Sequence, residues 1–477
     1  MPRTATHVGV PLTLAPGADP LRHRVADAIV RALQDGRLRP GDRLPSTRIL
    51  AGDLGVSRGP VVAAYDELVA AGFVVARAGS GAVVADGADR AALAGAATHV
   101  PACGPSDPRG PTAAAPEPRW DLRPGRPDTT LLDPTAWRRA WRRAGSVVPG
   151  DEGCSPAPAH SALRQALAEH LRRSRGIGLT AEDLLVVPGV AASLHALPTA
   201  LGLVGRRIAL EDPGYVEAWT TFDRAGVGVQ GIPVDDDGLD PALLGRGVGA
   251  AYVTPSHQYP LGARMPVTRR VELLTWARAN DAIVIEDDYD GEFRYDVSPL
   301  PALRSLPGAA DQVLYIGTAS KLIAPSLRVA WLAPPPHLRE AVRLELEVRG
   351  LVVNEATGLA LAHFIESGSL ATHHARATRT YAARRAALVE AVTRRLPGLP
   401  LSGVDAGLHV VLRLPDEVDD LVLVTTLEAR GLLASPLSAY CATTHQSGLV
   451  LCYAGLPETR ADDAVQVLTD VIGAAVG

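Results

Sequence analysis

Short apolar runs alternate with longer segments of helical periodicity from about Arg119 to the end of the chain. Buried strands that alternate with helices are typical of a parallel or mostly parallel sheet with helices on both faces. We therefore expect a large α/β domain over residues 119–477, with a smaller α/β subdomain from about residue 367. The predicted strands are Leu184–Val187, Ile208–Leu210, Ala250–Val253, Ala282–Ile285 and Val313–Ile316.

The first 85 residues follow a different pattern, of three helices and a hairpin. Apolar residues recur at helical spacing between Pro20 and Gly36, and Ser46 and Ser57 are suited to cap two short helices. Two valine-rich runs around a glycine-containing turn indicate a two-stranded wing. We predict a winged helix-turn-helix here, followed by a linker over the Ala-, Pro- and Gly-rich residues 86–118.

Charge and composition argue against a membrane-spanning, secreted or cysteine-ligated metal protein. The 477-residue chain has a net charge of -5, although residues 1–85 hold ten Arg against seven Asp and Glu. No apolar run is long enough to span a membrane, and the N-terminus lacks the layout of a signal peptide. The four cysteines have no metal-ligand spacing. We expect a cytoplasmic protein with reduced thiols, no bound metal and two or three compact units.

Lysine occurs once in the chain, at position 321, so 46 of the 47 Lys and Arg residues are arginine. Arginine supplies charge and phosphate contacts equally well, but its guanidinium stays protonated, whereas a lysine amine can act as a nucleophile. The composition therefore indicates a reactive amine at Lys321. A surface lysine retained by chance is the alternative.

The sequence LPSTRILAGDLGVSR, which ends at Arg58, resembles the winged helix-turn-helix of GntR-type regulators. A helix that begins here would place Ser57 and Arg58 against phosphates and base edges, while the wing would offer Arg77 and Ser80 to the adjacent groove. Arg58 is expected to read bases and Arg48 to bind phosphate. A helix-turn-helix that contacts only protein is the alternative.

The sequence TASK, which ends at Lys321, resembles the Schiff-base lysine motif of fold-type I pyridoxal-phosphate enzymes. The only lysine of the chain thus coincides with the lysine of the motif. Pyridoxal phosphate requires an amine for its aldehyde, an anion for its ring nitrogen, a flat group against its ring and donors for its phosphate. The resemblance implies that Lys321 supplies the amine.

Other candidate cofactor residues follow predicted strands, where such folds bind ligands. By the resemblance, Asp287 pairs with the pyridine nitrogen, Tyr289 reaches the ring hydroxyl and Tyr215 stacks on the ring. Tyr259 belongs to another sequence after a strand, SHQYP, which is expected to line the same face. The residues expected to meet the phosphate are Gly189, Val190, Thr318, Ser320 and Arg328.

A GntR-type reader joined through a linker to an aminotransferase-like domain resembles the MocR family of regulators, over nearly the whole chain. The resemblance implies a homodimer that binds promoter DNA and senses pyridoxal phosphate, or an amine or amino acid that condenses with it. Two stretches depart from the family pattern. Cys154–Ala159 replaces a turn that carries a phosphate-binding tyrosine, and Leu449–Tyr453 holds no arginine for a substrate carboxylate, with Val450 at its expected place.

Three functions remain open at this stage: a pyridoxal-phosphate-dependent transcription regulator, an active aminotransferase, and a DNA-binding protein whose large domain is empty. The absence of a late arginine favours the regulator over the enzyme. The set of Lys321, Asp287 and Tyr215 disfavours an empty domain.

Overall fold

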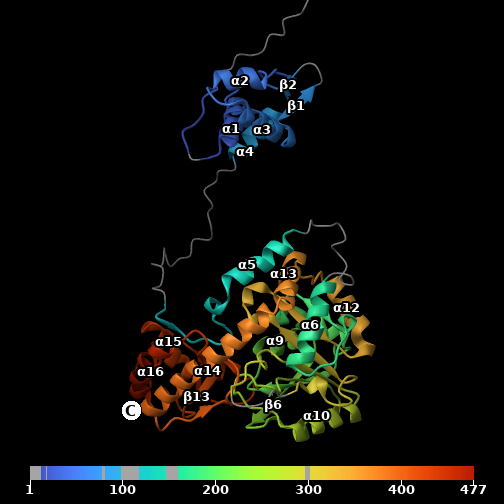
Figure 1. The fold of residues 1–477 in the computed structure, drawn as a ribbon, viewed down its shortest axis with the longest axis vertical. Helices are drawn as coiled ribbons and strands as arrows, with labels where there is room; N and C mark the ends of the chain where they lie inside the picture. Colours follow the sequence, from blue (N-terminus) through green and yellow to red (C-terminus); the bar gives the residue numbers. More distant parts are fainter. Residues whose placement is uncertain are drawn as a thin grey trace, which may run out of the picture. The chain divides into compact units, whose positions relative to one another are not determined.

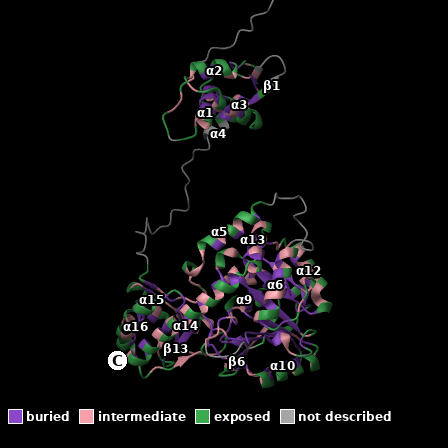
Figure 2. Ribbon diagram, in the orientation of Figure 1, coloured by how far each residue is buried: buried purple, intermediate pink, exposed green. Residues whose placement is uncertain are grey.

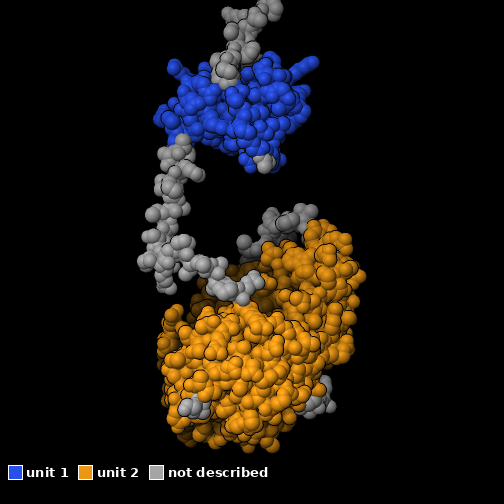
Figure 3. Space-filling model, turned by 90° about the vertical axis from the view of Figure 1, so that its left-hand side faces the viewer, with its two compact units in different colours: residues 1–115 blue, residues 116–477 orange. Residues whose placement is uncertain are grey.

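The chain folds into two compact units, Met1–Ala115 and Pro116–Gly477 (Figure 3). The computed structural model describes residues 12–17, 19–77, 81–97, 118–146, 160–295 and 301–476. Each unit buries its own hydrophobic core, as separate domains do. Within the described ranges, no helix combines the length and the apolar character that crossing a bilayer requires.

The N-terminal unit is a winged helix-turn-helix, as predicted. On one face of its first helix, Val25, Ile29 and Leu33 are buried in the core of the unit. Ser46 Oγ accepts a hydrogen bond from Ile49 N at 3.3 Å and so caps the second helix. The elements are α1 (Leu21–Gln34), α2 (Thr47–Asp53), α3 (Arg58–Ala70), the antiparallel pair β1 (Val74–Arg77) and β2 (Gly81–Val84), and α4 (Ala88–Ala97) (Figure 1).

Helix α4 lies in a stretch that we expected to be linker, and this expectation was wrong for residues 88–97. Ala88 and Ala92 are buried in the N-terminal core, and the side-chain amide of Gln34 donates to Ala92 O at 3.0 Å. Alanine has the highest helix propensity, and its small side chain lets α4 pack closely on α1. The linker can therefore begin only after Ala97.

The C-terminal unit is built on an eight-stranded sheet of order β4-β11-β10-β9-β8-β5-β6-β7. The central strands pair in parallel, and only β11 and β7 run antiparallel to their neighbours, so the sheet is mostly parallel, as predicted. The strands are β4 (Leu185–Val187), β5 (Arg207–Asp212), β6 (Gly228–Asp235), β7 (Gly238–Leu239), β8 (Val248–Val253), β9 (Ile283–Asp287), β10 (Val313–Thr318) and β11 (Ala330–Ala333).

Helices cover both faces of this sheet. Along β8, Ala250 and Tyr252 belong to one buried cluster, whereas Ala251 and Val253 belong to another, because successive side chains of a strand point to opposite faces. Figure 2 shows the buried residues concentrated in the interior and the exposed ones on the outer helices. The helices are α5 (Pro134–Ala144), α6 (Ser161–Ser174), α7 (Val190–Leu194), α8 (Leu197–Ala200), α9 (Val216–Arg224), α10 (Val267–Ala279), α11 (Ala319–Leu322), α12 (Arg339–Val348) and α13 (Glu355–Glu366).

The last part of the chain forms a smaller α/β subdomain around a four-stranded antiparallel sheet of order β12-β13-β16-β15. The start of the unit returns to this subdomain, because β3 (Trp120–Asp121) pairs in parallel with β14 (Leu432–Leu433). The sequence did not predict this pairing. The other elements are α14 (Ser369–Arg395), β12 (Leu401–Ser402), β13 (His409–Arg413), α15 (Asp420–Ala429), β15 (Ser435–Pro436), β16 (Gly448–Cys452) and α16 (Ala461–Val476).

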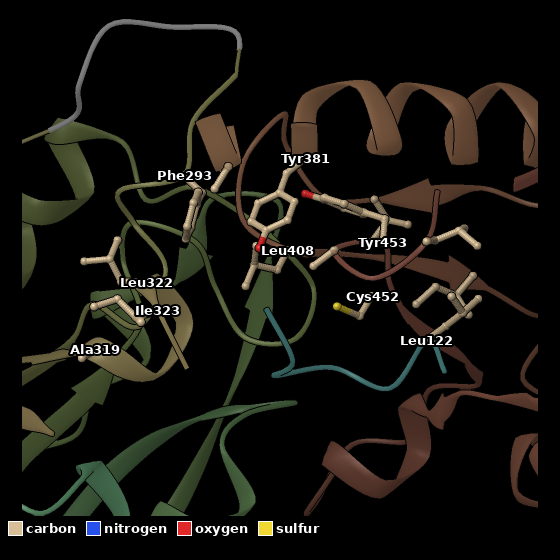
Figure 4. Packing of buried hydrophobic residues seen from close by; sticks show 14 of the residues in the cluster. Leu122, Phe293, Ala319, Leu322, Ile323, Tyr381, Leu408, Cys452 and Tyr453 are labelled. Atoms are coloured by element: carbon tan, nitrogen blue, oxygen red, sulfur yellow. The ribbon is translucent and has the colours of Figure 1, made fainter. Parts of the chain in front are cut away.

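A continuous buried cluster joins the large sheet to the subdomain. Figure 4 shows Phe293 and Leu322 from the first side of this cluster and Tyr381 and Tyr453 from the second. Phe293 and Tyr381 meet edge to face, with ring centroids 5.3 Å apart. The cluster holds the short helix of Lys321 in place, because Ala319 and Leu322 of α11 are buried in it.

Candidate functional site

A cavity of about 650 Å³ opens where β9 and β10 end, at the carboxyl edge of the parallel strands. It collects residues from distant parts of the chain. Of the ten residues predicted to bind the cofactor, nine line this cavity and only Gly189 does not: Lys321, Asp287, Tyr289, Tyr215, Thr318, Ser320, Arg328, Val190 and Tyr259.

Lys321 lies on α11, immediately after β10. Thr318 Oγ1 accepts a hydrogen bond from Ser320 N at 3.1 Å and thereby begins this helix. The Lys321 amine donates to Gly125 O at 3.0 Å. Burial lowers the pKa of Lys321, although the nearby carboxylates of Asp290 and Asp287 oppose the shift. A lowered pKa increases the fraction of neutral amine, which is the nucleophilic form.

Asp287 is the last residue of β9 and its carboxylate is buried. The Tyr252 hydroxyl donates to Asp287 Oδ2 at 2.5 Å, whereas Asp287 Oδ1 is buried and has no hydrogen-bond partner among the described residues. Burial raises the pKa of Asp287 to about 7, which the Tyr252 hydrogen bond partly offsets. An unpaired oxygen on a buried carboxylate costs free energy, so this side chain is suited to receive a donor from a ligand.

Tyr252 is a site residue that the sequence analysis missed. Its ring lies roughly parallel to that of Tyr215, with centroids 6.4 Å apart and an interplanar angle of 22°. The signal was present in the sequence, since Tyr252 is the only residue of the predicted strand Ala250–Val253 with a polar side-chain group, and a buried hydroxyl needs a partner.

The cavity also presents a cation, the guanidinium of Arg328. Gly189 has φ of 102°, and a Cβ atom placed on it would lie 3.0 Å from the guanidinium carbon of Arg328. Arg328 itself adopts the left-handed region, with φ of 51°, which is unusual for a residue other than glycine. The backbone at Gly189 thus makes room for a guanidinium beside the first residues of α7, although Gly189 itself does not line the cavity.

Tyr289 takes part in a buried hydrogen-bonded group. Its hydroxyl lies 2.9 Å from His257 Nδ1, which also lies 3.0 Å from Asp290 Oδ2. A Cβ on Gly407 would collide with both His257 and Asp290, so glycine is required there. His257 lies in the SHQYP sequence that was expected on this face, but neither His257 nor Asp290 was assigned a role from the sequence.

Three side chains of this region could geometrically hold a metal ion, because ligand atoms of His257, Asp290 and His409 lie within 4.8 Å of one another. His409 Nε2 lies 2.9 Å from Pro260 O. Burial, followed by the neighbouring His257, lowers the pKa of His409 to about 4. These contacts account for the cluster without an ion, and we assign none to it.

Besides the predicted Arg328, two further arginines line the cavity. Strand β16 holds no arginine, but Val450 packs with Leu261, Val411 and Leu437 and does not line the cavity. Arg123 and Arg126 line it instead. Both form ion pairs with Asp121, at 2.7 Å and 2.8 Å. The pairing of β3 with β14 brings this segment to the cavity, and sequence reasoning could not find it because the two strands lie far apart in the chain.

The N-terminal unit exposes most of its predicted contact residues. Arg48 on α2, and Ser57 and Arg58 at the start of α3, are exposed. Arg58 Nε donates to Thr47 Oγ1 at 3.2 Å, and the Tyr65 hydroxyl donates to Pro45 O at 2.7 Å, which fixes α3 against the preceding turn. The backbone of Arg77 ends β1; Ser80 and the stretch Cys154–Ala159 lie outside the described residues.

Comparison with known families agrees with the division of the chain into two units. Residues 21–84 match "Bacterial regulatory proteins, gntR family", and residues 125–468 match "Aminotransferase class I and II". The latter fold is that of pyridoxal-phosphate-dependent enzymes.

Two similar regulators span most of the chain. The pyridoxine biosynthesis transcriptional regulator PdxR of Corynebacterium glutamicum is 38% identical over 87% of this chain and 88% of its own length. The probable rhizopine catabolism regulatory protein MocR of Rhizobium meliloti is 34% identical over 94% of this chain and 93% of its own.

Solved structures resemble the C-terminal unit in fold. An archaeal alanine:glyoxylate aminotransferase superposes with a TM-score of 0.70 at 22% identity, covering 74% of this chain and 91% of its own. A multiple substrate aminotransferase of Thermococcus profundus has a TM-score of 0.67 at 24% identity, covering 75% and 91%. With its GntR-type winged helix and its aminotransferase class I and II domain, the chain belongs to the MocR family of transcription regulators.

Proposed function

We propose that this regulator holds pyridoxal phosphate at Lys321 and senses either the cofactor itself or an amine or amino acid that condenses with it. One observation carries the proposal: the cavity contains both the chain's only lysine and an oxygen of the buried Asp287 carboxylate that has no partner in the part of the chain that the structure describes. When bound, pyridoxal phosphate supplies an electrophilic carbon that reacts with amines.

The residues present fit this group. The Lys321 amine would bond the aldehyde, and Asp287 Oδ1 would accept a hydrogen bond from the protonated ring nitrogen. Tyr215 offers a ring face beside Tyr252, while Tyr259 and Tyr289 close the same side. The groups proposed for the phosphate are the Arg328 guanidinium, the Thr318 and Ser320 hydroxyls and the backbone at Gly189 and Val190.

The same proposal assigns DNA contacts to the winged helix and a homodimer to the assembly. Arg58 and Ser57 at the start of α3 would contact base edges and phosphates, and Arg48 would bind phosphate. On the wing, Arg77 and Ser80 would contact the adjacent groove. The C. glutamicum relative is named for regulating pyridoxine biosynthesis, which supports pyridoxal phosphate as the sensed ligand. The R. meliloti relative is named for rhizopine catabolism, which leaves an amine or amino acid as the alternative.

The test is chemical trapping. Protein incubated with pyridoxal phosphate should absorb in the visible, and borohydride reduction should fix the cofactor covalently on the peptide that contains Lys321. Lys321→Arg should abolish both signals while keeping the far-UV circular dichroism spectrum. A trapped adduct on any other residue of the native protein would refute the assignment.

Aminotransferase activity is the second candidate, because Arg123 and Arg126 at the cavity could bind a substrate carboxylate. Both guanidiniums already donate hydrogen bonds to Asp121, so neither has all its donors available for a substrate carboxylate. We expect little or no net amino-group transfer when the protein is incubated with amino acids and a keto acid. Sustained turnover on the order of 1 per second would establish the enzyme instead.

A further inference from the structure

Four of the eleven residues of helix α5 are exposed arginines that share one face of the helix. Ala136, Ala140 and Ala144 are buried, and Trp137 packs edge to face on Phe364 of α13 with ring centroids 5.5 Å apart. At 100° per residue these positions occupy one side of the helix. The opposite side is exposed and holds Thr135 together with four arginines, Arg138, Arg139, Arg142 and Arg143.

No acidic side chain balances this face among the described residues. The helix itself contains no Asp or Glu, and none of the four arginines forms an ion pair with a described residue. Within the same part of the chain, their only side-chain hydrogen bond is that of Arg138 Nε to Pro134 O. On α6, by contrast, Arg172 and Arg173 share Glu169. Arginines in the last turn of α5 interact favourably with the helix dipole, but this does not account for Arg138 and Arg139, which lie nearer the start.

Four exposed arginines without an acidic partner give this surface a local positive potential on a chain of net charge -5, and such a potential favours an anionic partner. The guanidinium fork matches phosphate oxygens in pairs. The stretch Arg138–Arg143 extends about 7.5 Å along the helix axis, and duplex DNA carries one phosphate per strand every 3.4 Å or so. We infer that this arginine face of α5 binds the phosphate backbone of DNA that flanks the site held by the winged helix.

The length of the connection is compatible with this role. Residues 98–117 join α4 to the C-terminal unit. Twenty residues span at most about 70 Å, which is close to two turns of B-DNA. The contact is therefore expected on DNA near the reader's site, and it carries no sequence information, because phosphates are the same at every base pair.

The experiment compares two double variants of the full-length protein. Arg142→Gln/Arg143→Gln removes two charges from the face, and Arg172→Gln/Arg173→Gln removes two charges already paired with Glu169. The probe is a fluorescein-labelled 60-base-pair duplex of arbitrary sequence, titrated by anisotropy between 50 and 200 mM NaCl. Glutamine keeps the helix propensity of arginine, so both variants should fold.

Each lost phosphate contact should reduce the slope of log affinity against log salt by about 0.9, and the affinity in 0.1 M salt about eightfold. The α5 variant should therefore bind about 60-fold more weakly with a slope lower by about 2, whereas the α6 variant should match wild type. The same loss should persist when Arg58→Ala is present in both proteins. An α5 variant that equals the α6 variant would overturn the inference. A change in sedimentation of the α5 variant would also overturn it, by assigning the face to a contact between protein chains.

Discussion

Removal of the Tyr252 hydroxyl should weaken binding of pyridoxal phosphate with little change in the shape of the cavity. Tyr252 donates a 2.5 Å hydrogen bond to the carboxylate of Asp287, and both groups are buried. The ionised carboxylate is the form that can hold a proton on the ring nitrogen. In Tyr252→Phe this form loses a donor, so the pKa of Asp287 should rise above its present value of about 7.

The magnitude follows from the type of bond. A hydrogen bond to a charged group contributes about 1.5–3 kcal/mol, and about 1.4 kcal/mol corresponds to tenfold in affinity. The dissociation constant for pyridoxal phosphate should therefore rise about 10- to 150-fold at neutral pH. It is measured by titrating cofactor-free protein and following the visible absorbance.

Tyr315→Phe is the matched control. The Tyr315 hydroxyl donates to Asp288 Oδ2 at 2.8 Å, so the same atom is removed from a buried carboxylate one residue further along the chain. Asp288 is paired with Arg175 and does not line the main cavity. This variant should melt at a lower temperature yet bind the cofactor within about twofold of wild type. Equal affinity for Tyr252→Phe and wild type, or equal weakening in both variants, would refute the reasoning.

Three further predictions follow from the site and the reader. Burial raises the pKa of Asp287 to about 7 from an ordinary value of 3.8. The stability that the protonated Asp287 carboxyl contributes to cofactor-free protein should therefore be lost as pH rises from about 4 through 7. Asp287→Asn should flatten the dependence of melting temperature on pH over this window. Gly189→Ala should weaken cofactor binding at least tenfold, measured by the same titration, since φ of 102° is strained for alanine and the new Cβ would press on Arg328. Arg58→Ala should reduce discrimination between the native promoter and unrelated DNA by about 1–3 kcal/mol in competition assays, while Arg48→Ala should weaken binding to both.

Local sequence was enough to predict much of the fold and the centre of the site. Lys321, Asp287 and Tyr215 each lie in a short motif just after an apolar strand, and parallel strands bring their carboxyl ends to one edge of a sheet. Hydrophobic periodicity likewise predicted the winged helix. Such features depend on residues close together in the chain.

Features that depend on distant pairing escaped prediction. Arg123 and Arg126 reach the cavity only because β3 pairs with β14, some three hundred residues later, and no local pattern records that contact. The SHQYP sequence was expected on the same face as Tyr289, but the specific contact between Tyr289 and His257, which joins segments after different strands, was not predicted. Helix α4 was missed for another reason: its alanines fit a linker composition equally well, and only packing against α1 decides between the two.

The short segment from Pro118 to Gly125 reaches the cavity at its end and continues the chain from the connection to the N-terminal unit. It leads directly out of the connection to the DNA reader, is clamped by β3 against the subdomain, and ends at the carbonyl that accepts the hydrogen bond of Lys321. Any group that bonds to the Lys321 nitrogen competes for this hydrogen bond. A group bound to the Lys321 nitrogen would therefore affect the backbone only seven residues from Pro118, where the connection to the N-terminal unit ends. A signal from the ligand to the DNA-binding unit would not need to cross the sheet.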